Sequence, residues 1–136
     1  MNNTNLAWVA GFFDGEGCLN IQNRRDEGKG ISFRLTLKQA RERGRKVLSK
    51  IKEDLNCGNF YHCGASWQYE VSKRDDLKKV LTMLSPFLRI KNEEVNRFLS
   101  LLELWESKRV APKKEWRDKP DYGIYGRYKI EASPPI

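Results

Sequence analysis

The stretch from Leu6 to Gly17 constrains the fold of this chain more than any other part of the sequence. Its apolar residues recur at the spacing i, i+3, i+4 and i+7, which is typical of the buried face of a helix. These residues are Leu6, Val9, Ala10 and Phe13. The stretch then ends in Asp14-Gly15-Glu16-Gly17, where glycines separate two carboxylates and favour a turn. We therefore expect an apolar helix that ends in an acidic turn.

Two features of this helix point beyond simple packing. Glycine in a helix interior costs about 1 kcal/mol relative to alanine, so the adjacent Ala10 and Gly11 predict that a second helix approaches closely. A carboxylate at the end of a helix also meets the negative end of the helix dipole, which is unfavourable without a cation. A divalent metal ion would supply that cation.

The composition bounds the class of protein. The chain has 136 residues, which fits one domain, and its 26 Lys and Arg exceed its 18 Asp and Glu for a net charge of +8. Such an excess fits a polyanionic partner, although a ribosomal or membrane-surface protein would carry it equally. We expect an intracellular protein, because no apolar run reaches the length of a membrane span and the first residues lack the pattern of a signal peptide. The odd number of cysteines, three, without paired spacing predicts reduced thiols and no zinc site.

Alternating residues predict two neighbouring strands, over Cys18–Arg25 and Ile31–Lys38, joined by the loop Asp26–Gly30. One face of both strands is apolar. The other face carries side chains suited to base edges and phosphates, namely Asn20, Gln22, Arg24, Ser32, Arg34, Thr36 and Lys38. A solvated sheet face has much the same composition, so both interpretations remain open at this point.

The rest of the chain continues the alternation of helices and strands. We expect a helix over Gln39–Asn56, strands over Asn59–Cys63 and Trp67–Ser72, and helices over Asp75–Leu84 and Glu93–Lys108, with a break at Pro86. The order is α-β-β-α-β-β-α with one added helix, which predicts an α+β fold with an antiparallel sheet covered by helices on one face. This domain spans residues 1–109. Residues 110–136 form a basic and aromatic tail that we expect to pack irregularly on the domain.

The segment Val9–Gly17 resembles the signature of the LAGLIDADG homing endonucleases. The predicted order of elements is also similar to the core of that family, so the resemblance covers roughly residues 6–108. A second local match is Pro86–Lys91, which is similar to the family's segment before its last core helix. The resemblance implies a saddle-shaped antiparallel sheet whose polar face lies in the major groove of double-stranded DNA.

The resemblance also implies the site residues. Glu16 and the carbonyl of Gly15 would bind Mg²⁺ or Mn²⁺, with Glu in place of the aspartate that is commoner in the family. Lys91, Gln39 and Arg43 would complete the catalytic set. The DNA-binding set adds Gln68 and Glu70 to the polar residues of the first two strands. One copy of the motif implies a homodimer, for which we expect an interface made by Leu6, Val9, Ala10, Gly11, Phe13 and Asp14.

The resulting hypothesis is an intron-encoded homing endonuclease that cuts both strands of a long pseudo-palindromic site by metal-dependent hydrolysis. An intron RNA maturase, with the chain's own intron RNA as partner, is one alternative, and a catalytically silent DNA-binding relative is another. A basic ribosome-associated α+β protein is a third. In that case the acidic end of the first helix would have no function.

Overall fold

The computed structural model describes residues 2–23 and 30–108. Its elements follow the predicted order: α1 (Asn3–Glu16), β1 (Gly17–Asn23), β2 (Ile31–Ala40), α2 (Arg41–Leu55), β3 (Asn59–Cys63), β4 (Ser66–Val71), α3 (Arg74–Leu84), the short 3₁₀ helix η2 (Ser85–Phe87) and α4 (Asn92–Lys108). The α+β prediction is therefore confirmed. Most of the loop predicted between the first two strands, and the tail predicted at 110–136, lie outside the described residues.

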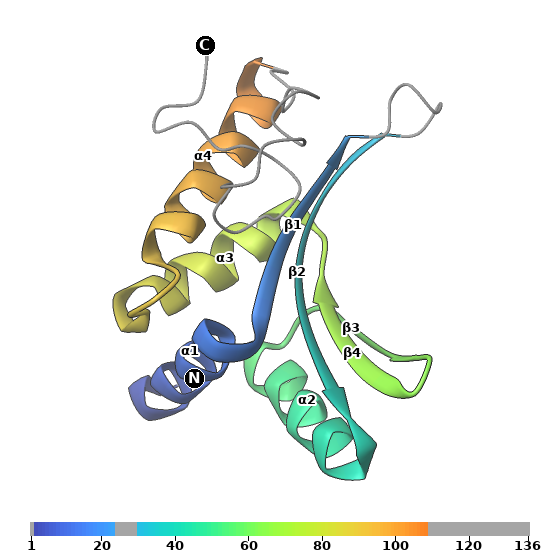
Figure 1. Ribbon diagram of the computed structural model, residues 1–136. Coiled ribbons are helices and arrows are strands. Elements are labelled where there is room, and N and C mark those ends of the chain that lie inside the picture. The colour runs from blue at the N-terminus through green and yellow to red at the C-terminus, as the bar shows by residue number, and fades with distance from the viewer. Residues whose placement is uncertain (1, 24–29, 109–136) are drawn as a thin grey trace.

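The four strands form one antiparallel sheet in the order β1-β2-β4-β3. Figure 1 shows the strands as a curved layer with all the helices on one side. Side chains alternate between the two faces of the sheet, and in β1, β2 and β4 the buried apolar residues point to the helices while the polar residues point to the open side. No described helix is long and apolar enough to cross a membrane.

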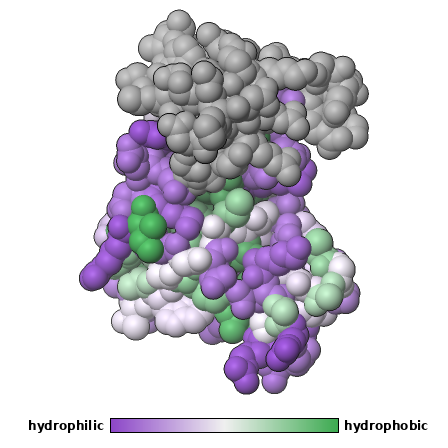
Figure 2. Space-filling model, in the orientation of Figure 1, coloured by the Kyte–Doolittle hydropathy of each residue, from purple (hydrophilic) through white to green (hydrophobic). Residues whose placement is uncertain are grey.

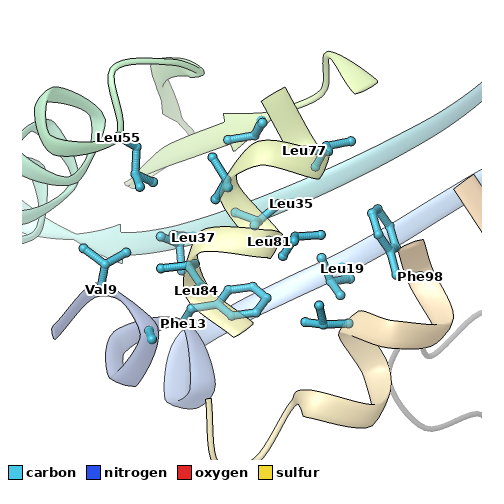
Figure 3. Close-up of a cluster of buried hydrophobic side chains, with 14 of the residues drawn as sticks. Val9, Phe13, Leu19, Leu35, Leu37, Leu55, Leu77, Leu81, Leu84 and Phe98 are labelled. Carbon is cyan, nitrogen blue, oxygen red and sulfur yellow. The ribbon is translucent and has the colours of Figure 1, made fainter. Parts of the chain in front are cut away.

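The core lies between the sheet and the helices. Figure 3 shows that its side chains come from both layers, including Val9 and Phe13 of α1, Leu35 and Leu37 of β2, and Phe98 of α4. The surface in Figure 2 is largely hydrophilic over the described part of the chain, with hydrophobic residues in small separate areas. The sheet is thus held in place by its apolar face, which leaves its polar face for other contacts.

Helix α1 extends further at its C-terminal end than the sequence predicted. The side chain of Asn2 caps its start by accepting a hydrogen bond from the backbone N–H of Asn5 at 2.8 Å. The predicted turn over residues 14–17 is wrong, because the helix continues to Glu16 and β1 begins at Gly17. Gly17 is needed for space and not for backbone freedom: its φ is −81°, and a Cβ there would lie 2.0 Å from the Phe13 ring.

The junction of β2 and α2 also differs from the prediction. The helix expected from residue 39 begins at Arg41, and Gln39 instead extends β2, where it pairs with Trp67 of β4. The first turns of α2 cross close over this strand end, since a Cβ on Gly44 would lie 2.6 Å from the Cβ of Gln39. The chain turns at Arg41 with a φ of 64°, in the left-handed region that few residues other than glycine adopt.

Candidate active site and DNA-facing sheet

The carboxylate of Asp14 joins the end of α1 to the segment before α4. Its Oδ2 accepts a hydrogen bond from the backbone N–H of Arg89 at 2.7 Å. Its Oδ1 accepts from the backbone N–H groups of Ile90 at 3.3 Å and Lys91 at 3.0 Å. Asp14 is the one buried charged residue of the described chain, with 7% of its surface exposed. Its carboxylate therefore has a structural role within its own subunit.

Lys91 returns a contact to the same helix. Its Nζ donates a hydrogen bond to the backbone carbonyl of Asp14 at 2.6 Å. This carbonyl belongs to the last turn of α1, where the peptide dipoles place negative partial charge, so the ammonium group stabilises the helix end. The Lys91 ammonium group thus supplies some of the positive charge that the acidic end of α1 calls for. The contact also fixes the Lys91 ammonium group at the carbonyl of Asp14, two residues before Glu16 in α1.

Glu16 and Gly15 form the exposed tip of α1. Gly15 lies in the last turn, where carbonyl oxygens have no partner further along the helix. One carboxylate and one carbonyl suit Mg²⁺, which prefers hard oxygen ligands and retains several waters. The described residues contain no group of three or more His, Cys, Asp or Glu that could enclose a metal ion by themselves. The donors present fit a metal ion that is bound jointly by protein, water and phosphate.

Gln39 lies where β2 passes the tip of α1, and Arg43 lines the same pocket as Gln39. Leu37 pairs with Gly17, the residue after Glu16, and Gln39 is two residues further along β2. Arg43 is exposed in the first turn of α2 and, like the exposed Arg41, lines an open pocket of about 350 Å³. Gln39 lines the same pocket, from the helix-covered side of the sheet. The structure therefore groups Gln39 with Arg43, and both stay predictions as catalytic residues.

The expected dimer interface requires a correction. Val9, Ala10 and Phe13 are at most 1% exposed, and Leu6 is 9% exposed. These side chains pack in the core of their own subunit and cannot face a partner, because a helix in a small domain first buries its apolar stripe there. The Asp14 carboxylate likewise binds its own subunit. Of the six expected interface residues only Gly11 is exposed.

A different face of α1 points outward. Ala7, Gly11 and Gly15 are exposed at a spacing of four residues, and a Cβ on either glycine would meet nothing within 4 Å. Trp8 lies beside them with 54% of its surface exposed, and its ring stacks on Phe12 with centroids 5.4 Å apart. This face, which we call the outer face of α1, combines small residues with one large exposed aromatic ring.

The open face of the sheet holds the predicted DNA-binding residues in register. Asn20 pairs with Arg34, and Gln22 pairs with Ser32 across β1 and β2. Between β2 and β4, Thr36 pairs with Glu70, and Lys38 pairs with Gln68. All of these side chains are at least partly exposed, and they share one face because alternate residues of a strand point the same way. Arg24, the remaining member of the predicted set, lies outside the described residues.

Tyr61 of β3 is a residue of this face that the sequence analysis missed. It pairs with Gln68, is 38% exposed, and accepts a hydrogen bond from Gln68 Nε2 at 2.7 Å. Its hydroxyl donates to Glu70 Oε1 at 3.3 Å, and Arg34 forms an ion pair with the same oxygen at 3.6 Å. Partial burial, followed by the Glu70 carboxylate, raises the pKa of Tyr61, so the hydroxyl remains a donor at neutral pH. The alternation of β3 could have identified Tyr61, but its neighbours Phe60 and His62 do not form a clear apolar face.

Glu94 is a second residue that the sequence analysis missed. It follows Lys91 by three residues, in the first turn of α4. Burial raises the pKa of Glu94, the Lys91 ammonium group opposes that rise, and the Asp14 carboxylate adds to it. Glu94 therefore belongs to the same electrostatic group as Asp14 and Lys91, at the junction of α1 and α4.

The comparisons with known proteins agree with this geometry. The DNA endonuclease I-CreI of Chlamydomonas reinhardtii is 29% identical over 115 residues, which cover 80% of this chain and 69% of that protein. The crystal structure of the homing endonuclease I-CvuI with its target, in the presence of calcium, matches with a TM-score of 0.69 and 25% identity over 78% of this chain and 70% of that one. The structure of the homing endonuclease I-TnaI matches with a TM-score of 0.64 and 28% identity over 76% and 74%.

The model of the family described as LAGLIDADG endonuclease matches residues 9–102. This range begins within the buried stripe of α1, contains Glu16, the whole sheet and Lys91, and ends in α4. The chain therefore belongs to the LAGLIDADG endonuclease family.

Proposed function

We propose that this chain is a site-specific homing endonuclease that cleaves both strands of a long, pseudo-palindromic DNA site as a homodimer, with Mg²⁺ or Mn²⁺ as cofactor. The observation that carries the proposal is the arrangement at the tip of α1. There Asp14 holds the segment before α4, Lys91 is fixed at the helix end, and Glu16 is exposed beside them. Family membership and the open polar face of the sheet support it.

DNA contacts are assigned to the open face of the sheet. Its polar side chains can hydrogen-bond to base edges in a major groove, and Arg34 is suited to guanine. Lys38, Arg41 and Arg43 are exposed at the end of β2 and the start of α2, and no ion pair of these three side chains occurs within the described residues. They can therefore bind phosphates.

Hydrolysis is assigned to the residues at the tip of α1. Glu16 and the Gly15 carbonyl would hold the metal ion, which supplies charge neutralisation of the scissile phosphate and a lowered pKa of bound water. Lys91 places a positive charge where the phosphate gains negative charge. Gln39 and Arg43 would orient the attacking water by hydrogen bonds.

Dimerisation is assigned to the outer face of α1. One helix supplies one acidic tip, and cleavage of two strands requires two tips close together. Gly11 and Gly15 leave space for a second helix to approach closely, and a two-fold axis through this face would bring two Glu16 side chains together.

The test is cleavage of a plasmid that carries the insertion site of the intron encoding this chain. We expect linear product with Mg²⁺, no product with EDTA, and no product for Glu16→Gln. Binding of the same site by Glu16→Gln should persist, because the variant removes a charge that repels phosphate. Glu103→Gln, an exposed carboxylate on α4, is the matched control and should cleave normally.

Other outcomes would contradict the proposal in distinct ways. Specific binding without cleavage in Mg²⁺ or Mn²⁺ would indicate a silent relative or a maturase. Cleavage that survives in Glu16→Gln would show that another residue holds the metal ion.

A further inference from the structure

The open face of the sheet contains one connected group of side chains that spans three strands. Tyr61 of β3 accepts from Gln68 of β4 at 2.7 Å and donates to Glu70 Oε1 at 3.3 Å. Arg34 of β2 pairs with the same Oε1 at 3.6 Å. The carboxylate of Glu70 is thus held between a hydroxyl group and a guanidinium group.

The two charged residues of this group, Glu70 and Arg34, differ in how far their side chains are exposed. The side chain of Glu70 is 14% exposed, whereas that of Arg34 is 40% exposed. A free carboxylate on this face would repel the phosphates of DNA, but here it is partly covered and its charge is paired. The Nη1–Oε1 distance of 3.6 Å is that of an ion pair and is longer than a hydrogen bond. The guanidinium N–H donors of Arg34 can therefore still serve an external acceptor.

We propose that Glu70 is a positioning residue for specificity: it contacts no base itself, and it orients Arg34 to donate two hydrogen bonds to a guanine. This inference rests on the proposed function and deepens it. It gives Glu70 a role different from the direct DNA contact that the sequence predicted. Tyr61 supports the arrangement by fixing the Glu70 carboxylate from the side opposite Arg34.

The chemistry explains why orientation matters. An arginine side chain has several rotatable bonds, and bidentate contact with the O6 and N7 atoms of guanine requires one orientation of its planar group. Without Glu70 the guanidinium group would be free to contact phosphate instead. Its affinity for DNA would then remain, but its discrimination between bases would fall.

The experiment uses the full chain and a DNA duplex library with a randomised central segment. Bound duplexes are selected in Ca²⁺ and sequenced for wild type, Arg34→Ala, Glu70→Gln and Tyr61→Phe. The positions that lose their guanine preference in Arg34→Ala define the site of Arg34. We expect Glu70→Gln to lower the preference for guanine about tenfold at those same positions and to leave the base preference at every other position unchanged. Tyr61→Phe should lose less, at the same positions.

A second measurement separates positioning from a general structural role. Affinity for a duplex of fixed, unrelated sequence is measured against salt concentration. Glu70→Gln should bind this duplex at least as tightly as wild type, with a log–log salt slope steeper by about one, because Arg34 becomes available to a phosphate. Glu103→Gln, the same change at an exposed position of α4 outside the sheet, is the matched control and should leave the guanine preference at the Arg34 positions unchanged.

The outcomes are distinct. If Glu70→Gln loses base preference at a position that Arg34→Ala leaves unchanged, Glu70 contacts a base itself. If Glu70→Gln loses base preference equally at all positions, Glu70 has a general structural role. Either result overturns the inference while the proposed function stands. A wild-type chain that enriches no sequence would overturn the proposed function, and the inference with it.

Discussion

Asp14 and Lys91 contact each other twice, through different groups. The backbone N–H of Lys91 donates to Asp14 Oδ1 at 3.0 Å, and Lys91 Nζ donates to the backbone carbonyl of Asp14 at 2.6 Å. The first contact joins α1 to the segment before α4, and the second places a positive charge beside the exposed tip of α1. The structural contact and the proposed chemistry therefore involve the same pair of residues but different atoms, and substitutions can separate them.

Asp14→Asn tests the structural contact. The substitution keeps the shape of the side chain but replaces an oxygen that accepts from backbone N–H groups with an NH₂ group. We expect it to lower the free energy of unfolding by about 1–3 kcal/mol, because hydrogen bonds to a buried carboxylate are lost. Urea unfolding measures this change. Glu16→Gln, at an exposed position, should unfold like wild type, and equal stability of Asp14→Asn would contradict the capping role.

Lys91→Met tests the chemical contact. The backbone N–H of residue 91 is retained, so we expect a loss of stability of only about 0.3–1 kcal/mol from the helix dipole. The rate of single-turnover cleavage should fall by on the order of a hundredfold or more, while the Kd for the site changes little. Lys91→Arg should recover part of the rate. A Kd that weakens as much as the rate would show that Lys91 contributes to binding and not to the reaction.

The residues of α1 show how far the sequence could determine the site. The spacing of the apolar residues predicted the helix, and the structure buries that apolar stripe in the core of its own subunit. The same stripe was then assigned to the dimer interface, which was wrong because one face of a helix cannot bury itself in two places. The outer face was harder to identify, because Ala7 and Gly11 have no chemical signature apart from their small size.

The sheet was more predictable than its edges. Strict alternation over residues 31–38 identified both faces of β2, because a strand with one buried face must alternate. The end of that strand was misassigned, because the cationic residues after Lys38 favour a helix and the pairing of Gln39 with Trp67 is a tertiary contact. The role that we propose for Glu70 could not be predicted from the sequence either, since it depends on contacts with Arg34 and Tyr61 from two other strands.

Gly11→Leu tests the proposed dimer. A leucine here adds bulk to an exposed face, so the isolated subunit should be as stable as wild type or more stable by about 0.5–1 kcal/mol. Between two closely packed helices the added bulk should weaken association by about ten- to a hundredfold. Sedimentation with and without DNA measures the shift to single chains, and cleavage of both strands should be lost with it.

The matched control for this prediction is Thr82→Leu. It places the same side chain at an exposed position of a different helix, α3. It should leave both the association and the cleavage unchanged. If Gly11→Leu sediments like wild type, the second subunit does not approach through the outer face.

Tyr69 gives the stability of this fold a dependence on alkaline pH. Its side chain is fully buried, and its hydroxyl donates to the backbone carbonyl of Cys57 at 2.8 Å. Burial, followed by the neighbouring Cys57, raises the pKa of Tyr69 far above its ordinary value. The folded state therefore keeps its proton where the unfolded chain, with a phenol pKa of about 10, loses it. Since the unfolded state binds fewer protons above that pH, the free energy of unfolding falls as pH rises.

Tyr69→Phe isolates this contribution from other groups that titrate in the same range, such as Cys57, whose pKa burial also raises. Below pH 9 the variant should be less stable than wild type by about 1–2 kcal/mol, because the Cys57 carbonyl loses its partner. Above pH 10 the difference should shrink by up to about 1.4 kcal/mol per pH unit, since only wild type carries the phenol. Urea unfolding of both proteins from pH 7.5 to 11 measures the two curves. Curves that stay parallel over this range would show that Tyr69 ionises with equal ease in the folded and unfolded states.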